Sequence, residues 1–223
     1  MTAARIRPVP RGYTSSRGLD RVVFFTDAIA AIAITLLILP LVDLVPESAK
    51  TDPDPWAFMV ANAPQLLSFV ISFAVIARLW YAHHQIFEHV ARYSGRLALL
   101  SVIWAFTVVV LPLPTALVSE FDASVFTVIF YIGTMLLSSC TLTGMALLIR
   151  GSSHLESDDN PVSSKAIAGS LTTTALFAIA LAVGLFLPDV NYWALATLAL
   201  SGPVSAVVLR SMRAQRHGAA HGA

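Results

Sequence analysis

The stretch RVVFFTDAIAAIAITLLILPL, residues 21–41, decides the fold class of this chain. It is long and apolar enough to cross a hydrocarbon layer of about 30 Å, which takes roughly 20 residues of α-helix. It nevertheless carries Asp27 close to its start. A carboxylate at membrane depth costs several kcal/mol unless it is paired or hydrated. We therefore predict a transmembrane helix whose Asp27 accepts hydrogen bonds from neighbouring helices; the alternative is that Asp27 relays protons or cations.

Five further apolar blocks follow, and with the first they predict six transmembrane helices. The chain of 223 residues is 57% hydrophobic and 12% charged, about half the charged fraction of an ordinary soluble domain. The six blocks lie at about 22–42, 57–80, 97–118, 124–149, 166–187 and 192–209. The first block is interpreted as a retained helix, because it contains a charge and lacks the small-residue cleavage site of a secretory signal. The predicted fold class is an all-α polytopic membrane protein.

The basic residues predict the orientation of the helices. Of the 14 Lys and Arg residues, only Lys50 falls on one side of the six predicted spans, and all the others fall at the opposite side. Short loops rich in Lys and Arg stay cytoplasmic, so we expect a multi-pass protein of the cell membrane with both termini cytoplasmic. We expect a flexible basic N-terminus over 1–18, a six-helix transmembrane domain over 19–210, and a flexible cytoplasmic tail over 211–223. Residues 43–55 are expected to form the longest outer loop.

One face of the first helix carries a stripe of mostly apolar side chains. In an ideal α-helix each residue turns by about 100°, so with Ile32 at zero, Leu36 falls near +40° and Leu39 near −20°. Ala28 and Thr35 complete the same stripe, at about −40° and −60°. Asp27 falls at about −140°, well away from the stripe. Whatever Asp27 binds, the geometry predicts that it points away from Ile32, Leu36 and Leu39.

Three short motifs resemble one known family. Arg21-x-x-x-Phe25-Thr26-Asp27 is similar to the Arg-x-x-x-Phe-Ser-Asp signature on the first helix of the transmembrane protein 175 potassium channel family, with threonine in place of serine. The segment WYAHHQIF, residues 80–87, resembles the Trp-x-x-His-His segment at the end of that family's second helix, and LPLPT, residues 111–115, resembles the end of its third. The resemblance covers the first three predicted helices, and the later three agree with the family only in number and hydrophobicity.

The resemblance implies a passive, weakly selective potassium channel rather than an enzyme. Because this chain carries one copy of the signature, it implies a homotetramer whose first helices line a central pore. The residues that match the family's hydrophobic constriction are Ile32, Leu36 and Leu39, with Thr35 as a polar layer. The resemblance also implies a hydrogen-bond network that fixes the first helix against the second, made by Arg21, Phe25, Thr26, Asp27, Trp80, His83 and His84. The implied partners are potassium and other monovalent cations, the lipid bilayer and further copies of the chain, and no cofactor is implied.

Two other functions compete with the channel. The cluster HHQIFEH, residues 83–89, places His84 and Glu88 four residues apart, a spacing at which two helical side chains can share a metal. The alternative interpretation of these histidines is that they lie at the membrane interface, pack on Trp80 and cap the second helix. A proton-coupled secondary transporter of a small solute would use Asp27, His83 and His84 to handle protons, but no matched pair of broken helices supports it. No enzyme motif is present, and the basic N-terminus is interpreted as a topology signal rather than a nucleic-acid arm.

Overall fold

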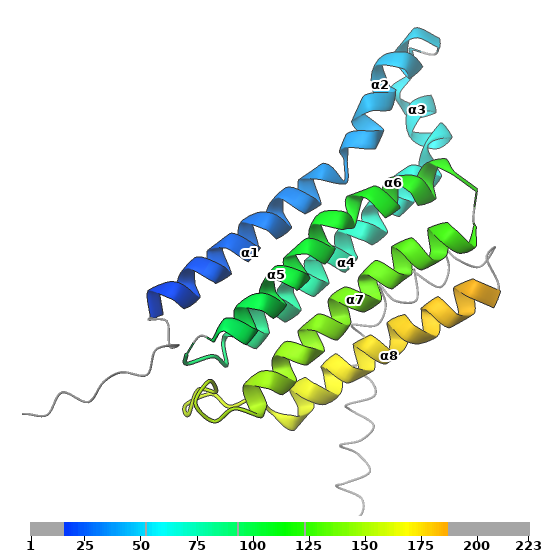
Figure 1. Cartoon of the computed structure of the whole chain (residues 1–223). Coiled ribbons are helices and arrows are strands. Elements are labelled where there is room, and N and C mark those ends of the chain that lie inside the picture. The colour runs from blue at the N-terminus through cyan, green and yellow to red at the C-terminus, as the bar shows by residue number, and fades with distance from the viewer. Residues whose placement is uncertain (1–15, 52, 93, 123, 187–223) are drawn as a thin grey trace, which may run out of the picture.

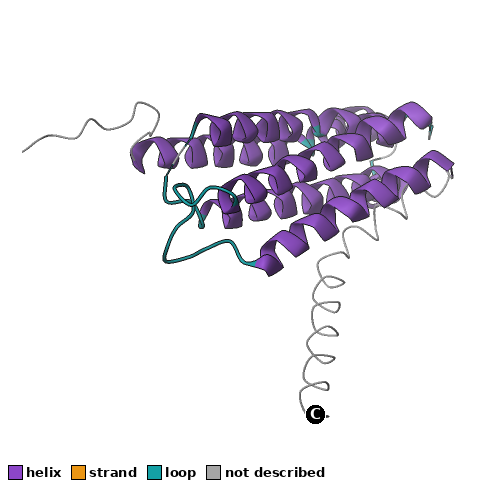
Figure 2. Cartoon of the chain, turned by 60° about the horizontal axis from the view of Figure 1, so that its bottom comes forward, coloured by secondary structure: helices purple, strands orange, loops and turns teal. Residues whose placement is uncertain are grey.

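The computed structural model describes residues 16–51, 53–92, 94–122 and 124–186. These residues form helices and loops without a β-strand (Figure 2), and an isolated bridge joins Val90 to Glu156. The helices run side by side as an elongated bundle (Figure 1). Their bounds are α1 Ser16–Leu36, α2 Leu39–Thr51, α3 Pro55–Ala61, α4 Ala63–Phe87, α5 Gly95–Val110, α6 Pro112–Glu120, α7 Val125–Arg150 and α8 Ser164–Phe186.

Five helical stretches in the described residues are long and apolar enough to cross a membrane: Gly18–Thr51, Ala63–Phe87, Gly95–Glu120, Val125–Arg150 and Ser164–Phe186. They correspond in order to the first five predicted spans, which confirms the all-α membrane architecture. The sixth predicted span, 192–209, lies outside the described residues. Most of 1–18 and all of 211–223 do as well, although the helix α1 already begins at Ser16.

Prolines divide two of the spans into consecutive helices. Pro40 has no N–H to donate to the carbonyl of Leu36, and α1 ends at that residue before α2 resumes at Leu39. Pro112 begins α6 directly after Leu111, which separates α6 from α5. In both places the helix continues after a short interruption, because proline is tolerated in the first turn of a helix, where its N–H would be unpaired anyway.

Two predicted boundaries are wrong. Residues 43–55 are not all loop, because α2 continues to Thr51. Pro46 lies inside this helix and has no N–H for the carbonyl of Val42. Both residues are exposed, so this carbonyl is open to solvation. The second span begins at Ala63 rather than at 57 and ends at Phe87 rather than at 80. The last two turns of α4 stay helical because their side chains at positions 83 and 87 are buried in the bundle.

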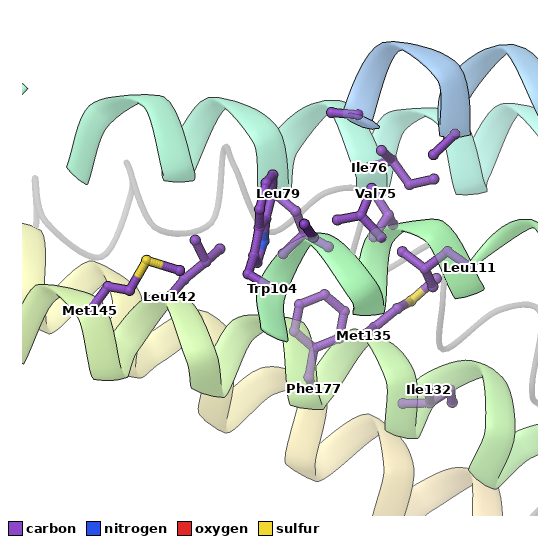
Figure 3. Close-up of a cluster of buried hydrophobic side chains, with 14 of the residues drawn as sticks. Val75, Ile76, Leu79, Trp104, Leu111, Ile132, Met135, Leu142, Met145 and Phe177 are labelled. Carbon is purple, nitrogen blue, oxygen red and sulfur yellow. The ribbon is translucent and has the colours of Figure 1, made fainter. Parts of the chain in front are cut away.

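A continuous apolar core joins α4, α5, α7 and α8, and Figure 3 shows its centre. Trp104, Ile76, Ile132 and Met135 are all fully buried there. Hydroxyl pairs link the same helices, such as Ser139 with Thr174 and Thr143 with Ser170 between α7 and α8, and Thr115 with Ser72 between α6 and α4. In a bilayer such interhelical hydrogen bonds and close packing hold helices together, because lipid gives no hydrophobic drive between them.

Close contact between α7 and α8 depends on Gly184. A Cβ atom at that position would lie 2.8 Å from Val128 Cγ1 of α7, well inside normal van der Waals contact. We predict that Gly184→Ala lowers the thermal unfolding temperature of the purified protein, at a cost of about 1–3 kcal/mol for overpacking. The matched control is Gly169→Ala on the same helix, where a Cβ would meet nothing within 4 Å. Equal unfolding temperatures for the two variants would contradict the packing argument.

Candidate functional site

The helix α1 packs on the bundle through one narrow face. Thr26, Ala30 and Ala33 of α1 are buried, and Leu37 in the break and Leu41 in α2 continue the pattern, at spacings of four, three, four and four residues. This spacing is that of one helical stripe, and it lies against α4, α5 and α6. Three of the five side chains are small or polar, which lets α1 lie close to its neighbours.

The described residues leave the opposite face of α1 uncovered. Ile32 is 58% exposed, Leu36 40% and Leu39 46%. Ala28 and Thr35 are also exposed, and the Thr35 hydroxyl donates to the carbonyl of Ile32 at 2.7 Å. The structure thus places all the predicted pore residues on the face that the chain itself leaves open. Leu39 lies beyond the break at 37–38 and begins α2, whereas the sequence prediction had it within one uninterrupted helix.

A single direct hydrogen bond joins α1 to α4 through the signature aspartate. The indole Nε1 of Trp80 donates to Oδ1 of Asp27 at 2.8 Å. Both residues are half-buried, so the carboxylate has a protein donor where water is scarce. A hydrogen bond to a carboxylate contributes about 1.5–3 kcal/mol. Asp27 is turned away from the exposed stripe, as the helical angles predict.

The other predicted members of this network on α1 occupy different surroundings. Thr26 is buried, but its hydroxyl donates to the carbonyls of Val22 and Val23 in its own helix. Arg21 and Phe25 are exposed. The structure therefore brings Asp27 and Trp80 together, and it leaves Arg21 and Phe25 facing outward from this chain.

The two adjacent histidines of α4 point to different neighbours. His84 stacks on Trp80, with ring centroids 5.9 Å apart, and its Nε2 lies 3.8 Å from Oε1 of Glu88. His83 is fully buried and stacks on Trp104 of α5 at 4.1 Å. The predicted packing on Trp80 is confirmed for His84. The predicted interfacial, capping position is wrong for His83, because α4 continues to Phe87 and His83 is buried against α5. Successive residues on a helix differ by about 100°, so the pair cannot share one partner.

No group of three or more His, Cys, Asp or Glu side chains that could hold a metal ion forms within the described residues. His84 and Glu88 do lie within reach of each other, but His89 turns its Nδ1 toward the carbonyl oxygen of Asn160 at 2.9 Å. The segment HHQIFEH is thus dispersed over three environments in the folded chain.

Two residues that the structure places in notable surroundings, Trp104 and Arg78, were not predicted from the sequence. Trp104 was not singled out, although a tryptophan within an apolar span is the natural aromatic partner for a buried histidine. Arg78 was not singled out either, because the predicted span 57–80 puts it at the end of a helix, whereas α4 continues for nine residues beyond it. A prediction that extended this helix to Phe87 would have placed Arg78 inside the span, where an arginine needs a partner.

Comparisons with known proteins match the region that contains this site. Residues 21–112 match the family model described as endosomal/lysosomal potassium channel TMEM175. A potassium channel of Streptomyces collinus is 39% identical over 101 residues, which are 45% of this chain and 48% of that protein. The mouse endosomal/lysosomal proton channel TMEM175 is 37% identical over 89 residues, 38% of this chain and 18% of that protein. The matches therefore span about half or less of each relative's length.

The fold is also similar to a solved structure, that of a lysosomal potassium-selective channel TMEM175 homolog from Chamaesiphon minutus. The TM-score is 0.68 at 22% sequence identity, over 85% of this chain and 98% of the other. The structural similarity thus extends beyond residue 112, into helices where the sequences have diverged.

Proposed function

We propose that this chain, whose residues 21–112 match the TMEM175 family model, is a subunit of a passive, weakly selective potassium channel. Four copies surround a central pore lined by α1, with both termini on the cytoplasmic side of the cell membrane. The observation that carries the proposal is the uncovered stripe of Ile32, Thr35, Leu36 and Leu39 on a helix whose opposite face is packed. The family is one of ion channels, which agrees with the absence of an enzyme motif in the sequence.

The composition of the uncovered face favours contact with other copies over contact with lipid. On α5 the exposed residues are bulky, such as Leu99, Val102 and Phe106, as is usual for a surface that meets acyl chains. On α1 the exposed face includes Ala28 and Ala31 between the larger residues. Small side chains are enriched where transmembrane helices approach one another closely. A face that mixes small residues, large apolar residues and one hydroxyl suits helices that converge around an axis.

Rings of apolar side chains can gate such a pore without a selectivity filter of carbonyl groups. A narrow ring formed by Ile32 from each copy excludes water and therefore ions, and a small widening admits both. No array of oxygens then replaces the hydration shell of potassium, so discrimination against sodium is modest. Asp43, which is exposed one turn beyond Leu39, adds negative charge toward the outer mouth and raises the local cation concentration.

The test is cation flux in liposomes that contain the purified full chain. We expect potassium efflux down its gradient to exceed sodium efflux, and both to exceed the leak of protein-free liposomes. Proton flux is measured in parallel, because the animal relatives are named proton channels. Flux no greater than that of protein-free liposomes, with a well-formed oligomer, would contradict the proposal. Saturable uptake of an organic solute driven by a proton gradient would favour the transporter alternative.

A further inference from the structure

An arginine lies within the span of α4 without an acidic partner. Arg78 is half-buried, and its Nη2 donates to the hydroxyl of Thr173 on α8 at 3.2 Å. Its Nε is buried and has no hydrogen-bond partner among the described residues. The ion pairs among the described residues are Lys50–Glu47 and His84–Glu88, and neither includes Arg78. A charge inside a membrane span is normally paired or faces a hydrated cavity, so this guanidinium has donors left to satisfy.

Arg78 lines a groove of about 250 Å³ whose walls are α4 and α8 and whose floor is α7. The helix α7 packs against both walls (Figure 1). The polar lining residues Arg78, Tyr81 and Gln85 follow one stripe of α4 at steps of three and four residues, and His89, two residues beyond the end of α4, continues it. Tyr81 and Gln85 are exposed, so the stripe leads from the arginine to the open side of the groove.

The chemistry of the groove is that of a site for an anion. Ser139, Ser170 and Thr173 also line the groove, and no acidic side chain is among its lining residues. Two carboxylates that flank the lining residues in the sequence have other partners: Glu88 lies 3.8 Å from His84, and Glu156 accepts from the backbone N–H of Val162. A guanidinium presents a planar fork of donors that matches phosphate and carboxylate oxygens. The hydroxyl groups beside it are already bonded, since Thr173 donates to the carbonyl of Gly169 while Ser139 and Ser170 pair with Thr174 and Thr143. The guanidinium is therefore the principal donor that the groove offers.

The acidic residue that follows α8 in the sequence is too far from Arg78 to reach it. Residues 187–223 hold one acidic residue, Asp189. It follows Phe186 by three residues, which reach about 10 Å when fully extended. Thr173, to which Arg78 is bonded, lies thirteen residues before Phe186 on α8, or about 20 Å along the helix. Asp189 therefore cannot be the counter-charge of Arg78, and an anion from outside the described residues is the candidate partner.

We propose that the groove between α4 and α8 binds a phosphate group, with Arg78 as the principal ligand. The apolar lining residues Leu79, Ile86 and Leu142 beside the polar stripe suit the acyl chains of a phospholipid whose head group enters the groove. Inorganic phosphate from the aqueous phase offers the same oxygens. The site is on the face of α4 opposite Trp80, which is two residues and thus about 200° away. The inference therefore does not depend on ion conduction by α1.

Binding is measured as the rise in unfolding temperature of the purified full chain in detergent. The probes are dioleoyl phosphatidic acid against dioleoylglycerol, which lacks the phosphate, and sodium phosphate against sodium chloride at equal ionic strength. We expect phosphatidic acid to raise the unfolding temperature and dioleoylglycerol not to do so. Arg78→Gln is expected to weaken the apparent affinity by at least roughly tenfold, the loss that follows from removing one charge-assisted hydrogen bond.

A second variant tests the groove without removing the arginine. A Cβ at Gly169 meets nothing within 4 Å, so Gly169→Leu fills the groove while leucine favours the helix more than glycine does. We expect it to weaken phosphatidic acid binding as Arg78→Gln does. Gly144→Leu is the matched control, because Gly144 also has open space around it but does not line the groove.

The outcomes divide clearly. Loss of the stabilisation in Arg78→Gln and Gly169→Leu, with Gly144→Leu unchanged, supports the site. If sodium phosphate also raises the unfolding temperature, and the same variants abolish this rise, the ligand is the free ion. If only phosphatidic acid raises the unfolding temperature, the ligand is the lipid head group. Equal stabilisation of all four proteins, or none of the wild type by either probe, overturns the proposal. Neither result bears on whether the chain conducts ions.

Discussion

Ile32→Asn is expected to raise the cation flux per reconstituted channel by about tenfold, a change that needs only about 1.4 kcal/mol off the barrier to permeation. Ile32 is among the most exposed apolar residues of α1, at 58%, and in the proposed tetramer it contributes a ring of four side chains. Asparagine is close to isoleucine in size but carries an amide that holds water. A wetted ring no longer presents the desolvation barrier of an apolar one. The measurement is potassium efflux from liposomes at matched protein density.

The control for Ile32→Asn is Ile179→Asn on α8. Ile179 is 59% exposed, so the two substitutions change the same side chain at almost the same exposure on different helices. If α1 lines the pore and α8 does not, only the first changes the flux. Equal flux from Ile32→Asn and from the wild type, with an intact oligomer, would show that the stripe faces lipid. A similar increase in both variants would indicate a general leak caused by a polar residue in the membrane.

The membrane spans were predictable because the bilayer fixes their length. A block of about 20 apolar residues has one stable solution in lipid, an α-helix whose backbone groups are all bonded internally. The ends of the spans were less predictable. Hydropathy ends a span where polar residues begin, but α4 continues through His83 and His84 to Phe87. Those residues are held by neighbouring helices, and which helix lies beside them is not a local property of the sequence.

The candidate site was predictable in kind and only partly in detail. The cost of an unpaired carboxylate predicted that Asp27 has a partner on another helix, and helical angles predicted that it turns away from the Ile32 stripe. Which of His83 and His84 is buried against Trp104 of α5 depends on the rotation of α4 against α5, which the sequence does not fix. The role of Arg78 required the position of α8, which is distant along the chain.

Asp27→Ala is expected to impair assembly and folding before it alters ion preference. The substitution leaves the Trp80 indole N–H without its acceptor at the contact between α1 and α4, where the bond now measures 2.8 Å. Loss of a hydrogen bond to a carboxylate costs about 1.5–3 kcal/mol, and in a tetramer this cost recurs in every subunit. We expect a smaller fraction of the purified protein to elute as the oligomer in gel filtration, together with a lower unfolding temperature.

Trp80→Phe removes the same bond from the other side and should reproduce the loss of oligomer, since phenylalanine keeps an aromatic ring for His84 but has no N–H. Asp158→Ala is the control for the loss of one acidic residue, because Asp158 is exposed in the loop between α7 and α8. An intact oligomer with a changed potassium-to-sodium ratio in Asp27→Ala would contradict this assignment and point to a carboxylate that meets the permeating ion. The helical angles argue against that result, because Asp27 and Ile32 lie about 140° apart on the same helix, and one helix cannot present both side chains to a single narrow axis.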